Sequence, residues 1–409
     1  MSDPIVIIGA GQAAASFISR SIALQQPLPL LLIGDEAFPP YQRPPLSKKY
    51  LLGELARERL FIRPQQWYAD HGVTTYFNTR VESIDPDNSQ VLITGGKTIT
   101  YSRLLLCTGS RARNLANAIG GNLPGVFTLR SIADVDRIKP IFRAHSRLLI
   151  LGGGYIGLET AAVARQLGLE VVLLEMAERI LQRVAASKTA DYFRTLHQSR
   201  GVDVRESTQV VRLTECNNRV SGAQLDNGKI IEADLVLVGI GGDANSELAE
   251  AAGLECRNGI AVNLTGQTSH ADIYAAGDCC SFRRDGTRIR LESVQNAADQ
   301  GDLVARVLAG EKTHYQALPW FWSEQYDCRL QIAGLNSGFD QTVLRPGNDG
   351  RQSVWYYRDH QLIAVDAMND PKAYAFGRKM ISVNINPPPA VIADPQTDLK
   401  KLIEGARTD

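Results

Sequence analysis

The 409-residue chain lacks several features that mark common classes of protein. Its six cysteines show no C-x-x-C spacing, which argues against a zinc or dithiol motif and favours reduced, structural thiols. Its six histidines are scattered without metal-ligand spacing, so no metal site is predicted. No apolar stretch reaches about 18 residues, and the N-terminal apolar run is only strand-sized, so no membrane span is expected. Basic and acidic residues number 44 each, which disfavours strong attraction to nucleic acid or anionic membranes. We therefore predict a soluble, cytoplasmic protein. Its length of 409 residues suits two or three domains.

Two glycine-rich turns, each directly after an apolar run typical of a β-strand, form the strongest pattern present. They are GAGQAA at 9–14 and GGGYIG at 152–157, and each leads into an alanine-rich stretch that predicts a helix. In such a unit the first glycine permits a tight turn, the second lets a pyrophosphate approach the main chain, and a third small residue lets helix pack on strand. These positions are Gly9, Gly11 and Ala14 in the first turn and Gly152, Gly154 and Gly157 in the second. Two dinucleotide sites are therefore predicted.

Each unit also carries an acid at the end of its second predicted strand, where a carboxylate would hydrogen-bond an adenosine ribose. Asp35 follows the apolar run at 30–33, and Glu175 follows the run at 171–174. Because Glu175 would repel the 2′-phosphate of NADPH, the second site is predicted to favour NADH. Arg179 lies close enough in sequence to keep that preference moderate.

Two further strand ends distinguish the first site from the second. The segment DIYAAGD, ending at Gly277 and Asp278, looks like the ribityl-binding end of a flavoprotein. Thr108 and Gly109, after another apolar run, resemble the strand end where such chains leave an FAD domain. FAD is thus assigned to the first unit and NADH to the second.

These motifs resemble those of the FAD- and NADH-dependent ferredoxin reductases of the glutathione-reductase-type flavoproteins, which serve bacterial haem-thiolate monooxygenases and ring-hydroxylating dioxygenases. The resemblance covers essentially the whole chain and rests on RPPLSK at 43–48, GYIGLE ending at Glu159, YAAGD, RLESVQNA at 290–297 and LPWFWSEQ at 318–325. It implies a flavoprotein oxidoreductase of electron transport that takes hydride from NADH and passes electrons singly to an acidic 2Fe-2S ferredoxin, which feeds a terminal oxygenase. Candidates for a basic patch that docks this partner are Arg63, Arg283, Arg284, Lys312, Arg378, Lys379, Lys400 and Lys401.

The resemblance also implies roles for individual residues. Lys48 and Glu159 would form an ion pair beside flavin N5 and tune its electron affinity, and Glu159 would reorient when nicotinamide enters. By the sequence alone, Val81 and Val294 indicate only a strand and a helix start, and Trp322 fits a core aromatic equally well. The FAD contacts implied by resemblance are Ala13, Asp35, Arg43, Lys48, Val81, Arg130, Asp278, Val294 and Trp322, and the NADH turn includes Tyr155 and Ile156.

The fold is predicted to be α/β, with two Rossmann-like nucleotide-binding domains and a C-terminal α+β domain that contains an antiparallel sheet. The FAD-binding domain would comprise 1–113 and 246–318, and the NADH-binding domain, 114–245, would be inserted in it. The C-terminal domain would comprise 319–409, where short strands alternate with turns and end in a surface helix.

Two other functions share parts of this pattern. A flavin NADH oxidase or peroxidase is disfavoured, because such enzymes carry a redox cysteine near their first strands and none precedes Cys107 here. An apoptosis-inducing-factor-like interaction protein shares the PPLSK loop, but the balanced charge and LPWFWSEQ favour the reductase. A redox role for the adjacent Cys279 and Cys280 stays open, because neighbouring residues form only strained disulfides. The cognate ferredoxin, the oxygenase system and the oligomeric state also stay open.

Overall fold

The computed structural model describes residues 3–405, and the chain divides into two compact units, each built from three separate segments. Unit 1 contains residues 1–43, 55–111 and 242–317. Unit 2 contains residues 44–54, 112–241 and 318–409. The three-domain division expected from the sequence stays a prediction, whereas the α/β fold class is confirmed.

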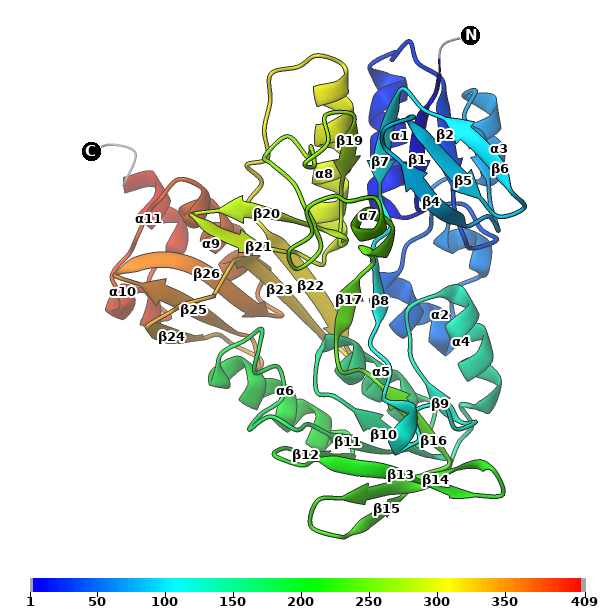
Figure 1. Cartoon of the computed structure of the whole chain (residues 1–409). Coiled ribbons are helices and arrows are strands. Elements are labelled where there is room, and N and C mark those ends of the chain that lie inside the picture. The colour runs from blue at the N-terminus through cyan, green and yellow to red at the C-terminus, as the bar shows by residue number, and fades with distance from the viewer. Residues whose placement is uncertain (1–2, 406–409) are drawn as a thin grey trace. The chain divides into compact units, whose positions relative to one another are not determined.

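Unit 1 is built on a parallel sheet of five strands in the order β19-β7-β1-β2-β3. The apolar runs form its central strands because both of their faces are covered, so every residue of β1, at Ile5–Ile8, is buried. Helices α1 and α8 pack against each other beside this sheet (Figure 1). The bounds are α1 Gln12–Ala23, β2 Leu30–Ile33, β3 Thr74–Tyr76, β7 Arg103–Leu106, β19 Ile273–Ala275 and α8 Val294–Leu308.

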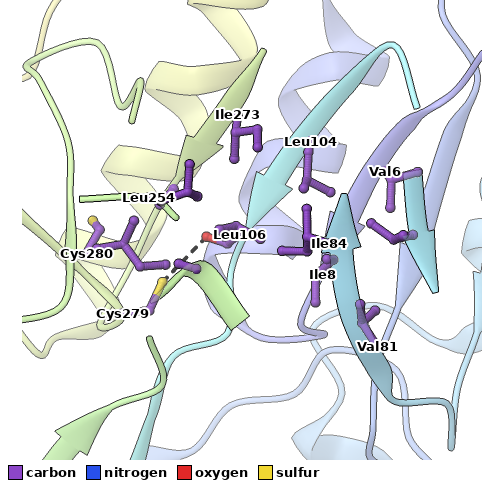
Figure 2. Close-up of a cluster of buried hydrophobic side chains, with 14 of the residues drawn as sticks. Val6, Ile8, Val81, Ile84, Leu104, Leu106, Leu254, Ile273, Cys279 and Cys280 are labelled. Atoms are coloured by element: carbon purple, nitrogen blue, oxygen red, sulfur yellow. Dashed lines mark hydrogen bonds between the residues drawn. The ribbon is translucent and has the colours of Figure 1, made fainter. Parts of the chain in front are cut away.

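The two faces of β1 contribute to two different hydrophobic clusters. Ile5 and Ile7 pack with residues of α1 and α8, whereas Val6 and Ile8 pack with Val81 and other residues of an antiparallel layer (Figure 2). Alternation along a strand produces this division. The smaller elements are η2 Arg57–Leu60, α3 Gln65–Asp70, β4 Val81–Asp85, β5 Gln90–Ile93, β6 Lys97–Thr100, β8 Ser110–Ala112, β17 Gly242–Ala244, α7 Glu247–Ala251, β18 Ile260–Ala261, β20 Cys280–Arg284 and β21 Thr287–Ile289.

Unit 2 contains a second five-stranded parallel sheet, in the order β12-β11-β10-β16-β9. A small antiparallel layer of β13, β14 and β15 accompanies it, and a turn at Asn217 and Asn218 joins β13 to β14. The bounds are β9 Val126–Phe127, β10 Arg147–Leu151, α5 Tyr155–Gln166, β11 Glu170–Leu174, α6 Ser187–Ser199, β12 Val202–Arg205, β13 Val210–Cys216, β14 Arg219–Leu225, β15 Ile230–Glu232 and β16 Leu235–Val238. Shorter helices are η1 Pro44–Ser47, α2 Lys49–Leu52, η3 Asn117–Ile119, α4 Ile132–Ile138 and η4 Lys139–Ile141.

The last segment of unit 2 forms the predicted antiparallel sheet, in the order β22-β23-β26-β25-β24. Helix α9 packs on β26 and β23, α11 packs on α9, and α10 packs on β24 (Figure 1). Within residues 3–405, no helix combines the length and the apolar character needed to cross a membrane. The bounds are β22 Trp320–Gln325, β23 Cys328–Gly334, β24 Gln341–Pro346, β25 Gln352–Arg358, β26 Gln361–Met368, α9 Pro371–Ser382, α10 Pro389–Ala393 and α11 Leu399–Gly405.

Candidate functional site

The first glycine turn leaves the start of α1 open to a ligand. Gly9 has φ +102°, and a Cβ there would lie 2.2 Å from the carbonyl oxygen of Cys107, so only glycine fits. Gly11 precedes α1 without a side-chain cap, and a Cβ at Gly11 would have no atom of the described residues within 4 Å. The first amide groups of α1 therefore face free space, which is the arrangement that binds a pyrophosphate.

The predicted ribityl-binding residues lie beside the same helix. Gly277 donates its main-chain N–H to Gln300 at 2.7 Å, and a Cβ on Gly277 would lie 3.3 Å from the Cβ of Ala13. Asp278 accepts a hydrogen bond of 3.1 Å from the hydroxyl of Ser110. The structure thus brings Ala13, Gly277 and Asp278 together within unit 1, and Ala14 is fully buried in the adjoining core.

Asp35 and Arg43 lie at the end of β2 and in the segment that follows it. The Asp35 side chain is exposed and makes no hydrogen bond or ion pair within the described residues, so its carboxylate is available to a ribose. Arg43 donates to the carboxylate of Glu36 at 2.8 Å and to the hydroxyl of Tyr41 at 3.0 Å. Their contacts with FAD stay predictions.

The remaining FAD positions predicted in unit 1 stand at the ends of elements. Thr108 donates its hydroxyl to the main-chain oxygen of Asn245 at 2.6 Å, and Gly109 has φ +67°. Val81 begins β4, and Val294 begins α8, as the sequence indicated. Because α8 starts at Val294, its first amides are suited to a ligand atom that gains negative charge.

The second glycine turn repeats the plan in unit 2. Gly152 has φ +108°, and a Cβ there would lie 2.4 Å from the carbonyl oxygen of Gly239. Gly154 precedes α5 without a side-chain cap and has free space where a Cβ would stand. A Cβ on Gly157 would lie 2.2 Å from the carbonyl oxygen of Gly152, so glycine lets the helix reach the strand. The residues of both turns therefore fit a dinucleotide pyrophosphate.

The side chain of Glu175 is hydrogen-bonded to the main chain of this second turn. One of its carboxylate oxygens accepts the N–H of Gly153 at 2.7 Å, and the other accepts the N–H of Ala177 at 2.8 Å. The side chains of Ile156 and Met176 are 42% and 70% exposed, which is unusual for large apolar groups. An acid fixed on the turn with exposed apolar groups nearby fits an adenosine moiety.

Lys48 and Glu159 form the predicted ion pair, and both belong to unit 2. The Lys48 ammonium nitrogen lies 2.8 Å from Oε2 of Glu159, and the two side chains are 13% and 5% exposed. The hydroxyl of Ser47 donates to the same Oε2 at 2.6 Å, and the hydroxyl of Ser323 donates to Oε1 at 2.7 Å. Both carboxylate oxygens are therefore held, so any reorientation of Glu159 must break buried hydrogen bonds.

Sequence reasoning missed Ser47 and Ser323 as partners of Glu159. Both serines stand in motifs that carry the family resemblance, RPPLSK and LPWFWSEQ. Polar Glu324 and Gln325 follow Ser323 in β22, so the composition of the strand did not mark Ser323 as buried; only the structure shows that its hydroxyl is buried and requires a partner. The hydrogen-bond partner of Ser323 could not be predicted from local sequence, since Glu159 lies 164 residues away.

Three other residues of unit 2 are predicted to contact the cofactors, and two of them, Tyr155 and Trp322, pack against other aromatic rings. Tyr155 begins α5, and its ring centroid lies 4.8 Å from that of Phe321. Its hydroxyl is buried without a hydrogen-bond partner among the described residues, and burial raises its pKa well above the usual value. Trp322 lies 5.5 Å from Trp320, ring to ring, and Arg130 directly precedes the residue that caps α4.

The cysteines are free thiols. Cys279 and Cys280 are fully buried, and burial raises the pKa of both, so they remain protonated near neutral pH. Cys279 donates to the main-chain oxygen of Leu106 at 3.5 Å (Figure 2). Because the thiolate is the reactive form, this pair is poorly suited to redox exchange.

Comparison with known proteins agrees with this geometry. A family model described as pyridine nucleotide-disulphide oxidoreductase matches residues 3–301, and one described as reductase C-terminal matches residues 320–403. The chain is 41% identical to a ferredoxin–NAD(P)(+) reductase, fdr, of a Sphingomonas species, over 98% of this chain and 97% of that protein. It is 40% identical to the rhodocoxin reductase of Rhodococcus erythropolis, over 98% and 94% of the two chains. The covalent putidaredoxin reductase–putidaredoxin complex contains a chain that superposes with a TM-score of 0.96 at 36% identity, covering 100% of this chain and 99% of that one.

Proposed function

The chain belongs to the pyridine nucleotide-disulphide oxidoreductase family and, within it, to the ferredoxin reductases, and on that premise we propose that it carries electrons from NADH through FAD to a 2Fe-2S ferredoxin. When bound, FAD supplies the chemistry that converts a two-electron hydride donor into a source of single electrons. The observation that carries the proposal is the pair of open glycine turns, Gly9 to Ala14 and Gly152 to Gly157, one in each unit. The predicted family, oxidoreductase class and cofactors are confirmed.

In unit 1, the first amides of α1 bind the pyrophosphate of FAD, and Asp35 accepts hydrogen bonds from its ribose. Asp278 orients the ribityl chain, because Ser110 holds its carboxylate in place at 3.1 Å. The start of α8 at Val294 would favour negative charge on a flavin bound there.

In unit 2, the start of α5 binds the pyrophosphate of NADH, and Glu175 accepts hydrogen bonds from the adenosine ribose. The Lys48 and Glu159 pair supplies a fixed, water-poor arrangement of charge, since both side chains are largely buried. Their proposed role is to tune the electron affinity of the flavin and to position the nicotinamide.

The test of the function measures cytochrome c reduction by the FAD-loaded protein with NADH. We expect slow reduction by the protein alone and at least about tenfold faster reduction when a 2Fe-2S ferredoxin is added, because the ferredoxin is the better electron acceptor. Equal rates with and without ferredoxins from several oxygenase systems would contradict the proposal. A burst of hydrogen peroxide that accounts for all the NADH consumed would instead support the NADH oxidase alternative.

The basic residues proposed to dock an acidic ferredoxin are distributed over both units, for example Arg283 in unit 1 and Arg378 in unit 2. Docking through basic residues of either unit would show itself as a fall in the association rate of the ferredoxin with rising ionic strength. We also propose a cytoplasmic location, which the free cysteines support, because thiols persist in a reducing compartment.

A further inference from the structure

A chain of hydrogen bonds runs through the buried interior of unit 2 and ends on the carboxylate of Glu159. The hydroxyl of Ser323 donates to Oε1 of Glu159 at 2.7 Å, and Nε2 of Gln325 donates to the oxygen of Ser323 at 3.1 Å. Nε2 of His197, on α6, lies 2.8 Å from Oε1 of Gln325. Glu159 is 4% exposed, and the other three residues have no exposed surface.

The direction of every hydrogen bond in this chain is fixed. Ser323 has one hydroxyl proton and gives it to Glu159, so it can only accept from Gln325. The amide of Gln325 must therefore turn its nitrogen to Ser323 and its oxygen to His197. An amide oxygen accepts only, so the proton of His197 lies on Nε2, and Nδ1 is left to accept from the hydroxyl of Tyr326, 3.4 Å away.

His197 is suited to this fixed role. Burial lowers the pKa of His197 to about 4, so the ring is neutral at physiological pH and does not alternate between charge states. The order of donors is therefore constant, and each hydrogen points toward the carboxylate. Aligned hydrogen bonds polarise one another in a low-dielectric interior, so the chain strengthens the final bond to the anion.

We propose that Ser323, Gln325 and His197 are positioning residues for Glu159, which hold its Oε1 in place while Lys48 and Ser47 bind Oε2. This inference deepens the proposed function and rests on it for the effect on turnover. The chain does not conduct protons, because an amide such as that of Gln325 would have to tautomerise to pass one on.

The first test addresses the chain without turnover. Nitrogen-15 NMR of the FAD-loaded protein labelled at histidine should show His197 as the Nε2–H tautomer, with no titration between pH 5.5 and 8. In Gln325→Leu, which removes the acceptor, this resonance should move or broaden. An Nδ1–H tautomer in the unmodified protein would overturn the assigned direction, whether or not the protein reduces a ferredoxin.

The second test compares Ser323→Ala, Ser323→Thr and a matched control, Ser353→Ala. Ser353 is also fully buried in the same sheet and accepts a hydrogen bond of 3.0 Å from Nε1 of Trp355, but within residues 3–405 it makes no hydrogen bond to Glu159, Ser323, Gln325 or His197. Losing a hydrogen bond to a charged group should slow flavin reduction by NADH by about tenfold or more in Ser323→Ala and shift the flavin midpoint potential. Ser323→Thr, which keeps the hydroxyl, should restore both values, and Ser353→Ala should leave both unchanged.

Two outcomes would count against the positioning role. If Ser323→Ala and the unmodified protein have equal flavin reduction rates and potentials, the hydrogen bonds from His197 to Glu159 have only a structural role. Equal losses in Ser323→Ala and Ser353→Ala would show that any cavity in this sheet has the same effect. Both readouts use NADH and the bound flavin only, so failure of ferredoxin as the acceptor is detected separately.

Discussion

The two glycine turns share one backbone plan, but they treat their acidic residue differently. Gly9 and Gly152 adopt nearly the same φ, +102° and +108°. In unit 2, Glu175 is already bound to the turn through the N–H groups of Gly153 and Ala177. In unit 1, Asp35 is exposed and unbonded within the described residues. The acid of the second turn is thus part of the folded structure, whereas the acid of the first contributes only when a ligand is present.

The turns also differ at their third small residue. Gly157 is required because a Cβ would lie 2.2 Å from the oxygen of Gly152, whereas the first turn tolerates Ala14. The close approach in unit 1 occurs elsewhere, where a Cβ on Gly301 of α8 would lie 2.2 Å from the oxygen of Ala13. In unit 2, the third glycine of the turn thus permits the close contact between α5 and its strand. In unit 1, the closest contact is between helices α1 and α8, and Gly301, which lies outside the turn, permits it.

The largest effects are expected from filling the free space of each turn. Gly154→Val should weaken NADH binding by about 100-fold, and Gly11→Val should do the same to FAD, because the added side chain occupies the place of the pyrophosphate. Within residues 3–405, no atom lies within 4 Å of a Cβ at either position, so the FAD-free proteins should unfold near the unmodified temperature. Isothermal titration and the flavin absorbance measure the losses. If Gly11→Val alone abolishes NADH binding, the assignment of FAD to the first turn and NADH to the second is contradicted.

Exchanging the third residues tests the packing difference directly. Gly157→Ala should lower the free energy of unfolding by about 1 to 3 kcal/mol, because the helix must move away from the strand. Ala14→Gly should cost only about 0.5 to 1 kcal/mol, the usual effect of replacing alanine by glycine within a helix. Denaturant unfolding of the FAD-free proteins gives both values, and the comparison fails if Ala14→Gly is the more damaging change.

Replacing each acid by alanine compares the stability that the hydrogen-bonded carboxylate of Glu175 contributes with the contribution of the exposed carboxylate of Asp35. Glu175→Ala should lower the free energy of unfolding by about 1 to 2 kcal/mol, because two main-chain donors lose their acceptor. Asp35→Ala should change it by less than about 0.5 kcal/mol without FAD, since no intramolecular bond is lost. Equal effects in FAD-free protein would mean that the two turns do not differ in this way.

The smallest effect expected is a change of coenzyme. Glu175→Ala combined with Met176→Arg should shift the ratio of kcat/KM for NADH over NADPH by about tenfold toward NADPH, because a repulsive charge is replaced by an attractive one. Met176 is 70% exposed, so the arginine adds little strain. The matched change in unit 1, Asp35→Ala, should leave the ratio as it was. Unchanged selectivity in the double variant would remove Glu175 from its role at the ribose.

The predictable part of this molecule is local in sequence. Strand, glycine turn, helix and acid follow one another within about 30 residues, so their spacing alone predicted both turns and both acids. The contacts on Glu159 were not predictable in this way, because Ser47 and Ser323 are 112 and 164 residues away. The antiparallel layer that begins at Val81 and covers one face of the first sheet likewise depends on tertiary packing.

The surroundings of Glu159 have a consequence for how the protein is made. The carboxylate needs Ser47 from the first segment of unit 2 and Ser323 from the last, so residues from three separate segments complete it. During synthesis from the N-terminus, Glu159 has left the ribosome long before its final donor exists. The carboxylate therefore cannot complete its set of hydrogen bonds until β22 has been synthesised.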